Sequence, residues 1–206
     1  MKKGKFIVFE GNEGTGKSYH VHFASNYLKS QNINHIITRE PGGTLLGEKI
    51  REILLDSNSK LDAVSEALLF YSSRVVNYNT VILESLNKGD YVICDRFHYS
   101  TLVYQGMVQK NEQVLNLHKV LDSYFSKDIS KIFFLDSEIE VCLQRINKRP
   151  STDKFEKQGK DFLIAVRDAY YKIFKDNLKV KTIKTDDKRE VAENLIREEI
   201  DNIINE

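Results

Sequence analysis

The chain has 206 residues, of which 41% are hydrophobic and 30% charged, a length and composition that suit one domain with a sizeable core. Its 31 basic and 30 acidic residues give a net charge of +1, so no global basic excess indicates a nucleic-acid partner. No stretch approaches the roughly 20 apolar residues of a membrane span, and the apolar run near the N-terminus is too short for a secretory signal. We therefore expect neither a membrane nor a nucleic acid among the partners.

Cysteines and histidines show no metal-binding spacing. Cys94 lies in a strand-like run and Cys142 in a helix-like run, and two thiols in a chain of this length suggest a reducing, cytoplasmic setting. His20 and His22 are two residues apart on an expected helix and would face different ways, and the other histidines are scattered. We expect no histidine metal site.

Short apolar runs alternate with helical patterns along the chain. The runs predict strands at residues 5–11, 35–40, 91–96, 131–137 and 180–185, and their near-continuous apolar character suits strands buried on both faces. Helical patterns occupy residues 17–31, 44–57, 61–88, 100–125, 138–149, 160–178 and 188–205. This alternation predicts an α/β fold, with a five-stranded parallel sheet and helices on both of its faces, in one domain of residues 1–206.

The first strand leads into a phosphate-binding motif. Residues 11–18 fit the pattern G-x-x-x-x-G-K-[ST], with a strand before and a helix after, which is the context this motif requires. Glycines permit positive φ, so that successive N–H groups point at phosphate oxygens beside a helix N-terminus. Lys17 would reach the β- and γ-phosphates and Ser18 would hold Mg²⁺. The predicted ATP-binding residues are Gly11, Asn12, Glu13, Gly14, Thr15, Gly16, Lys17 and Ser18.

Residues 87–90 read NKGD, which matches the guanine-reading motif N-K-x-D of GTPases. In GTPases that motif follows a core strand, whereas here it ends a helical pattern and precedes the strand at 91–96. Gly89 is therefore interpreted as a helix C-cap, and the match as a coincidence.

Asp95 and Arg96 end the strand YVICDR and favour a small kinase. A carboxylate at the carboxyl end of a buried strand can organise the Mg²⁺ shell, and the arginine can face a phosphate. The alternative is a strand-end ion pair without a catalytic role. Lys17, Asp95 and Arg96 are predicted catalytic residues, and Ser18 and Asp95 the metal ligands, partly through water.

The polar segment at 148–160 contains Pro150 and Gly159 and is interpreted as a lid. Cations gather in and beside it, and their spacing places positions 145, 148 and 149 on one helix face. A lid that brings cations onto a transferring phosphoryl group supplies charge stabilisation, although a solvated basic face is the simpler interpretation of Lys148. The cations are Arg145, Lys148, Arg149 and Lys154.

Three further motifs carry a resemblance to a known family. TREPGGT (38–44), LLFYSSR (68–74) and DRFHYSTLVYQG (95–106) stand in the order and spacing of the thymidylate kinases, and the resemblance covers nearly the whole chain. It implies a P-loop nucleoside monophosphate kinase fold with a short lid. It also implies phosphorylation of dTMP to dTDP by ATP with Mg²⁺, in dTTP biosynthesis, by an enzyme that is usually a homodimer.

The resemblance also implies an acceptor site. Phe70 would stack on thymine, Arg74 would donate to a base carbonyl, and Tyr104 would crowd the 2′ carbon. For both aromatic residues ordinary core packing is the alternative, but a platform with a donor suits an oxo base. Arg51 and Arg96 would grip the 5′-phosphate, Glu40 and Pro41 would line the pocket, and Ser100, Thr101 and Gln105 would complete it.

Glu13 is an acid within a phosphate-binding loop, where like charges about 4 Å apart repel by roughly 4 kcal/mol near a protein surface. The resemblance places this carboxylate beside the deoxyribose 3′-OH, turned away from the ATP phosphates.

Some family members carry an arginine at the next position, which here is Gly14, so the cation must come from the lid, as in the bacterial type. The family's Asp-Arg pair in the lid appears as Asp153-Lys154. Because lysine lacks a guanidinium fork, Arg149 becomes the main predicted catalytic cation of the lid.

Two alternatives remain open. The chain could phosphorylate another nucleoside monophosphate, such as dUMP or a purine nucleotide. It could also be a regulatory module that binds nucleotide without transferring a phosphoryl group, although Asp95, Arg96 and the lid cations together argue against this.

Overall fold

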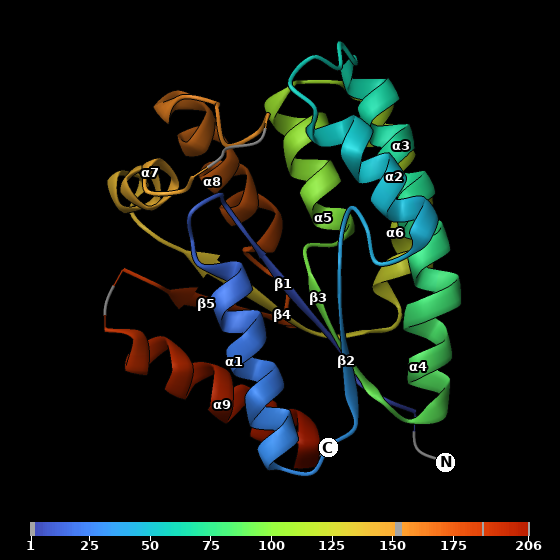
Figure 1. Cartoon of the computed structure of the whole chain (residues 1–206), viewed down its shortest axis with the longest axis vertical. Helices are drawn as coiled ribbons and strands as arrows, with labels where there is room; N and C mark the ends of the chain where they lie inside the picture. Colours follow the sequence, from blue (N-terminus) through green and yellow to red (C-terminus); the bar gives the residue numbers. More distant parts are fainter. Residues whose placement is uncertain (1–2, 151–153, 187, 206) are drawn as a thin grey trace.

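The computed structural model describes residues 3–150, 154–186 and 188–205. Its centre is a five-stranded sheet in which each strand pairs in parallel with its neighbours, in the order β2-β3-β1-β4-β5 (Figure 1). This confirms the predicted α/β fold with a parallel sheet. The strands are β1 (Phe6–Gly11), β2 (His35–Arg39), β3 (Tyr91–Asp95), β4 (Ile129–Asp136) and β5 (Val180–Lys184).

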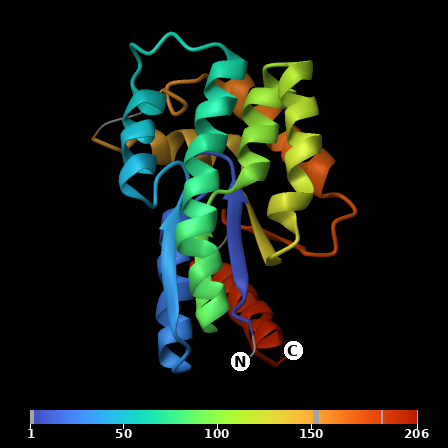
Figure 2. The ribbon, with the colours of Figure 1, turned by 90° about the vertical axis from the view of Figure 1, so that its right-hand side faces the viewer.

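Helices cover both faces of the sheet, as predicted (Figures 1 and 2). In chain order these are α1 (Lys17–Ser30), α2 (Leu45–Leu55), α3 (Ala63–Asn77), the π-helix η1 (Tyr78–Ile82), α4 (Leu83–Lys88), α5 (His98–Thr101), the π-helix η2 (Leu102–Val108), α6 (Glu112–Ser126), α7 (Ile139–Asn147), α8 (Lys160–Phe174) and α9 (Arg189–Asn205).

Alternate side chains of each central strand enter two separate hydrophobic clusters. In β1, Ile7 and Phe9 pack with α1 and α9, whereas Phe6 and Val8 pack with the helices from α3 to α6 and with α8. All four side chains are fully buried. Because successive residues of a strand point to opposite faces, a strand covered on both sides must be apolar throughout. This is why the apolar runs predicted the strands well.

Two predicted helices are subdivided. The helix expected at 61–88 consists of α3, η1 and α4, and its start is set by Asp62, whose carboxylate accepts a hydrogen bond from the Ser65 N–H at 2.7 Å. The helix expected at 100–125 is wrong as one element, because it is interrupted after η2. Lys110 has a φ of 52°, and Asn111 caps a new helix by accepting from the Val114 N–H at 3.1 Å. Capping residues inside an apolar pattern end one helix and begin another.

Helix α7 ends at Asn147, so Lys148 and Arg149 lie beyond it. The expectation that positions 145, 148 and 149 share one helix face is therefore wrong, because the chain turns before the second of them. Gly89, by contrast, is the C-cap of α4 with a φ of 90°, which supports the interpretation of NKGD as a helix end. Among the described residues, no helix combines the length and apolar character needed to cross a bilayer.

Candidate active site

The loop between β1 and α1 forms the floor of the site. Gly16, with a φ of 85°, precedes α1 and has no side chain to occupy the first N–H groups of the helix, which leaves them facing the pocket. Gly14 has a φ of 76°, and a Cβ there would come within 2.6 Å of the Cys142 carbonyl oxygen. A side chain at position 14 would therefore be strained and would clash with this carbonyl, so the loop requires glycine there.

Three predicted residues of this loop support it from below. The Asn12 amide donates to the Leu163 carbonyl oxygen at 2.7 Å, and the Thr15 hydroxyl donates to the Asn12 carbonyl oxygen at 2.9 Å. Gly11 ends β1. The side chains of Asn12 and Thr15 thus hold the loop in shape. The residues of the motif that line the pocket are Glu13, Gly14, Gly16, Lys17 and Ser18.

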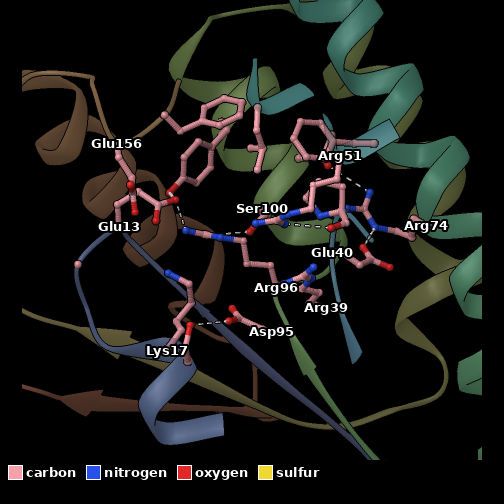
Figure 3. Close-up of a pocket in the computed structure, with 18 of the residues that line it drawn as sticks. Glu13, Lys17, Arg39, Glu40, Arg51, Arg74, Asp95, Arg96, Ser100 and Glu156 are labelled. Carbon is pink, nitrogen blue, oxygen red and sulfur yellow. Dashed lines mark hydrogen bonds and ion pairs between the residues drawn. The ribbon is translucent and has the colours of Figure 1, made fainter. Parts of the chain in front are cut away.

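Lys17 begins α1 at the end of the pocket nearest Asp95 (Figure 3), and Ser18 follows it in the helix. The Lys17 ammonium donates to the carbonyl oxygens of Asn12 at 2.7 Å and Gly11 at 3.2 Å. Burial, together with the charge of Arg96, lowers the pKa of Lys17 to about 8. The Ser18 hydroxyl donates to Asp95 Oδ2 at 3.3 Å, which places a hydroxyl and a carboxylate oxygen side by side. Such hard oxygen donors suit Mg²⁺.

Arg96 lies at the centre of the pocket and pairs with Glu13 (Figure 3). Its guanidinium also donates to the Gly11 carbonyl oxygen at 2.8 Å and to the Ser100 hydroxyl at 3.2 Å. Arg96 has a φ of 66°, an uncommon conformation for a residue with a side chain, which is found at functional sites. The ion pair of this arginine is thus made with Glu13, whereas the strand-end alternative would pair it with Asp95.

The Glu13 carboxylate turns toward residues predicted for the acceptor. Besides Arg96, it accepts a hydrogen bond from the Tyr104 hydroxyl at 3.4 Å. Burial opposes ionisation of Glu13, but the charges of Arg96, Lys17 and Arg149 outweigh it and hold its pKa below the usual value. Glu13 is therefore ionised at neutral pH, in an environment where three cations offset the repulsion that a nearby phosphate would cause.

Glu40 and Arg74 form a fully buried ion pair at 2.5 Å, with side chains that are 2% and 1% exposed. Arg74 also donates to Thr101 Oγ1 at 3.1 Å and to the Phe97 carbonyl oxygen at 3.3 Å. Burial raises the pKa of Glu40 to about 7 against the opposing charge of Arg74. Arg74 is consequently a structural residue as well as a lining residue, a role that its sequence motif did not indicate.

The lid covers the pocket with an aromatic side chain. Phe155 packs against Phe70, with ring centroids 6.2 Å apart, and against Tyr104, with centroids 5.8 Å apart. Arg149 pairs with Glu156 and lines the pocket, whereas Lys154 turns to Glu66 on α3. Asp153 lies outside the described residues. Arg149 and Lys154 therefore point to different partners, and of these two it is Arg149 whose charge lowers the pKa of Glu13.

One cavity of about 200 Å³ brings the predicted residues together (Figure 3). It contains every residue predicted for the acceptor site, together with the pocket-facing loop residues named above, Asp95 and Arg149. The acceptor residues are Glu13, Glu40, Pro41, Arg51, Phe70, Arg74, Arg96, Ser100, Thr101, Tyr104 and Gln105. The lining residues for which the sequence analysis assigned no role are Arg39, Leu55, Phe155 and Glu156.

Glu10 was also missed, although it supports the site from the end of β1. Its carboxylate is fully buried and accepts hydrogen bonds from the Phe97 N–H at 2.9 Å, the Ser100 hydroxyl at 2.6 Å and the Tyr170 hydroxyl at 2.8 Å. Burial raises its pKa despite these bonds. The sequence signal that could have identified Glu10 is an acidic residue at the end of an otherwise apolar strand.

A second polar cluster lies between α5 and α6, away from the cavity lining. The His98 Nε2 is 2.9 Å from Asp122 Oδ1, and the His118 Nδ1 is 3.1 Å from the Tyr71 hydroxyl. Burial lowers the pKa of His98 to about 4 and that of His118 to about 3. These contacts provide partners for His98 Nε2 and His118 Nδ1, whereas His98 Nδ1 is buried without a hydrogen-bond partner among the described residues, and three ligands fall short of the four of a structural zinc site. We interpret the cluster as a structural link between the helices.

Fold and site together define a P-loop nucleoside monophosphate kinase: a parallel sheet, a phosphate loop at its carboxyl edge, and a lidded pocket beside that loop. The model of the family described as thymidylate kinase matches residues 9–196. The chain belongs to the thymidylate kinase family.

Relatives and solved structures agree with this assignment. A thymidylate kinase of Rickettsia africae is 41% identical over 194 residues, covering 91% of this chain and 92% of the relative. A thymidylate kinase of Rickettsia bellii is 42% identical over 190 residues, covering 91% of this chain and 90% of the relative. One of Vesicomyosocius okutanii is 40% identical over 175 residues, covering 84% of each chain. The crystal structure of thymidylate kinase from Ehrlichia chaffeensis superposes with a TM-score of 0.74 at 29% identity, over 98% of this chain and 99% of that one.

Proposed function

We propose that this chain transfers the γ-phosphoryl group of ATP to dTMP, giving dTDP and ADP in dTTP biosynthesis, within a single catalytic domain. The observation that carries the proposal is the one cavity that joins the phosphate loop to a wall of aromatic residues and arginines. Membership of the thymidylate kinase family supports dTMP over other acceptors. The same membership does not favour a regulatory module without catalysis.

The donor would lie along the loop. The free N–H groups at the start of α1 would bind the phosphates, and Lys17 would exchange its two carbonyl partners for phosphate oxygens. Ser18 and Asp95 would hold Mg²⁺, which neutralises phosphate charge when bound. These residues position the γ-phosphoryl group toward Arg96 at the centre of the pocket.

The acceptor would occupy the opposite end of the cavity. Thymine would stack on Phe70 beneath the lid residue Phe155, and an N–H of Arg74 would donate to a base carbonyl. Tyr104, which is 5% exposed, would crowd the 2′ carbon and disfavour ribose. Arg51 and Arg96 would hold the 5′-phosphate, so that one of its oxygens faces the γ-phosphorus.

Phosphoryl transfer depends on position and charge more than on covalent chemistry. Arg96 would stabilise the charge shared by the two phosphates, and Arg149 would bring a second guanidinium from the lid. Glu13 would keep Arg96 in place and accept a hydrogen bond from the 3′-OH. An acid in the phosphate loop thus serves the acceptor, whereas the loop's backbone serves the donor.

The enzyme would act as a homodimer in the cytoplasm. Helices α2, α3 and α6 lie side by side on one flank (Figure 2) and expose large apolar side chains. Exposed apolar surface of this kind favours association with another protein surface. These side chains are Leu45, Leu46, Ile53, Leu68, Val75, Val120 and Tyr124.

The test is turnover with ATP, Mg²⁺ and dTMP by the wild-type chain and by Lys17→Ala. The variant should fold normally but lose more than about nine tenths of kcat, equivalent to at least about 1.4 kcal/mol of barrier. A wild-type chain that makes no dTDP would refute the proposed function. A variant that keeps more than a tenth of kcat would refute the phosphate-binding role of Lys17.

A further inference from the structure

Glu66 lies in the first turn of α3, and its side chain is 2% exposed. One carboxylate oxygen, Oε2, accepts hydrogen bonds from the Gln105 amide at 3.0 Å and the Gln109 amide at 3.3 Å. The other oxygen, Oε1, pairs with the ammonium of Lys154. A buried carboxylate is costly unless it is paired and hydrogen-bonded, and these three contacts meet that requirement.

The partners of Glu66 belong to two different parts of the site. Gln105 lies in the π-helix η2, is 1% exposed and lines the cavity. Lys154 belongs to the lid and directly precedes Phe155, which packs on Phe70 and Tyr104 over the same cavity. One carboxylate therefore holds a wall of the acceptor pocket and the lid that covers it.

Lysine at position 154 suits this arrangement. An ammonium is a compact charge that needs only one carboxylate oxygen, whereas a guanidinium fork matches both oxygens of a carboxylate. The contact with Oε1 leaves Oε2 to the two glutamines. The lysine thus pairs with Glu66 without competing with Gln105.

We infer that Glu66 is a positioning residue that couples lid closure to the shape of the acceptor pocket. Because Gln105 and Lys154 share its carboxylate, a ligand that orders Gln105 also favours the closed lid, and an open lid loosens Gln105. The identification of this ligand as dTMP rests on the proposed function. The contact between Glu66 and Lys154 can be tested separately from the acceptor, because hydrogen exchange of the lid needs no turnover.

The experiment is a double-mutant cycle with Glu66→Gln and Lys154→Met, which remove the charges but keep the side-chain lengths. Hydrogen exchange of the lid amides in the free protein is the first readout, and the KM for dTMP against that for ATP is the second. Each single variant should speed lid exchange and raise the KM for dTMP about tenfold, with the KM for ATP nearly unchanged. The double variant should be no worse than the more damaging single one, because both remove the same contact.

Lys160→Met is the matched control. Lys160 pairs with Glu140 at 2.5 Å, but both side chains are more than half exposed, so the loss of this pair should change neither readout. If Glu66→Gln fails to fold, as judged by thermal melting, Lys154→Met alone carries the test through lid exchange.

Additive effects of the two substitutions would overturn the inference, and so would a Lys154→Met lid that exchanges as slowly as the wild type. An equal rise of both KM values would also overturn it, because it would indicate a general structural defect. A wild-type chain without dTMP kinase activity would refute the proposed function but leave the exchange readout standing.

Discussion

Replacing Glu13 with glutamine tests why an acid lies within the phosphate loop. The substitution keeps the shape and one acceptor oxygen but removes the charge that pairs with Arg96. The backbone N–H groups of the loop are untouched, so the KM for ATP should stay within about twofold of the wild type. The loss should appear in the kcat/KM for dTMP.

The contacts of Glu13 set the size of this loss. A hydrogen bond to a charged group contributes about 1.5–3 kcal/mol, roughly twice a neutral one, so each contact weakened by the amide costs about 1 kcal/mol. The Tyr104 hydroxyl also donates to this carboxylate, but at 3.4 Å that bond is long and contributes little. On dTMP the effect therefore comes from two contacts, the Arg96 pair and the proposed bond from the 3′-OH. Together they amount to about 2 kcal/mol, or roughly 30-fold in kcat/KM.

The acceptor 3′-deoxy-dTMP separates the two contacts, because it has no hydroxyl to donate. On this acceptor the weakened Arg96 contact is the main term that remains, so the loss in kcat/KM should shrink to about fivefold. Steady-state kinetics of two enzymes on two acceptors provides the measurement. An equal deficit on both acceptors would refute the contact between Glu13 and the sugar, and a large rise in the KM for ATP would show that the carboxylate supports the loop instead.

Three further predictions follow from burial and charge. Arg74→Ala leaves the buried carboxylate of Glu40 unpaired and should lower the free energy of unfolding by about 3–5 kcal/mol in urea titrations; a loss below about 1 kcal/mol would contradict the buried pair. Arg149→Ala should lower kcat while the KM for dTMP stays constant, and it should cost some stability because its partner Glu156 is only 7% exposed; an unchanged kcat would remove Arg149 from catalysis. His98 and His118, with folded pKa values of about 4 and about 3, bind protons more weakly in the folded chain than in the unfolded one, so their contribution to stability is complete above pH 6.5 and falls by up to about 1.4 kcal/mol per unit for each as pH decreases. Glu40, whose pKa is raised to about 7, contributes with the opposite sign, so the histidine effect is measured as a difference between two chains. The unfolding free energy should fall less between pH 7 and pH 5 in a His118→Gln variant than in the wild type, and equal changes in both chains would contradict this.

Local patterns predicted the elements that position the site. The strand ending at Gly11 and the helix beginning at Lys17 are both evident from apolar character and glycine spacing. In the same way, the apolar run of β3 predicted that Asp95 lies at the carboxyl end of a buried strand. Parallel strands bring their carboxyl ends to one edge of the sheet, so the motifs that follow them meet there. This is why predictions made from separate motifs converge on one cavity.

Contacts between distant segments could not be predicted in the same way. The pairing of Glu66 with Lys154 joins residues 88 positions apart and depends on how the lid closes over α3. The interruption before α6 depends on a single capping residue, Asn111, within a pattern that otherwise continues as a helix. The π-helix η2, which presents Tyr104 and Gln105 to the pocket, has no signature in the apolar spacing.

The most direct test of the account is competition among acceptors. The wild-type chain would be incubated with ATP, Mg²⁺ and equal concentrations of dTMP, dUMP, dGMP and dAMP, and the nucleoside diphosphates formed would be quantified by mass spectrometry over the initial rate period. The pocket of Phe70, Arg74 and Tyr104 predicts dTDP as the dominant product. A purine diphosphate as the main product, or ADP formed from ATP without any new diphosphate, would contradict the account.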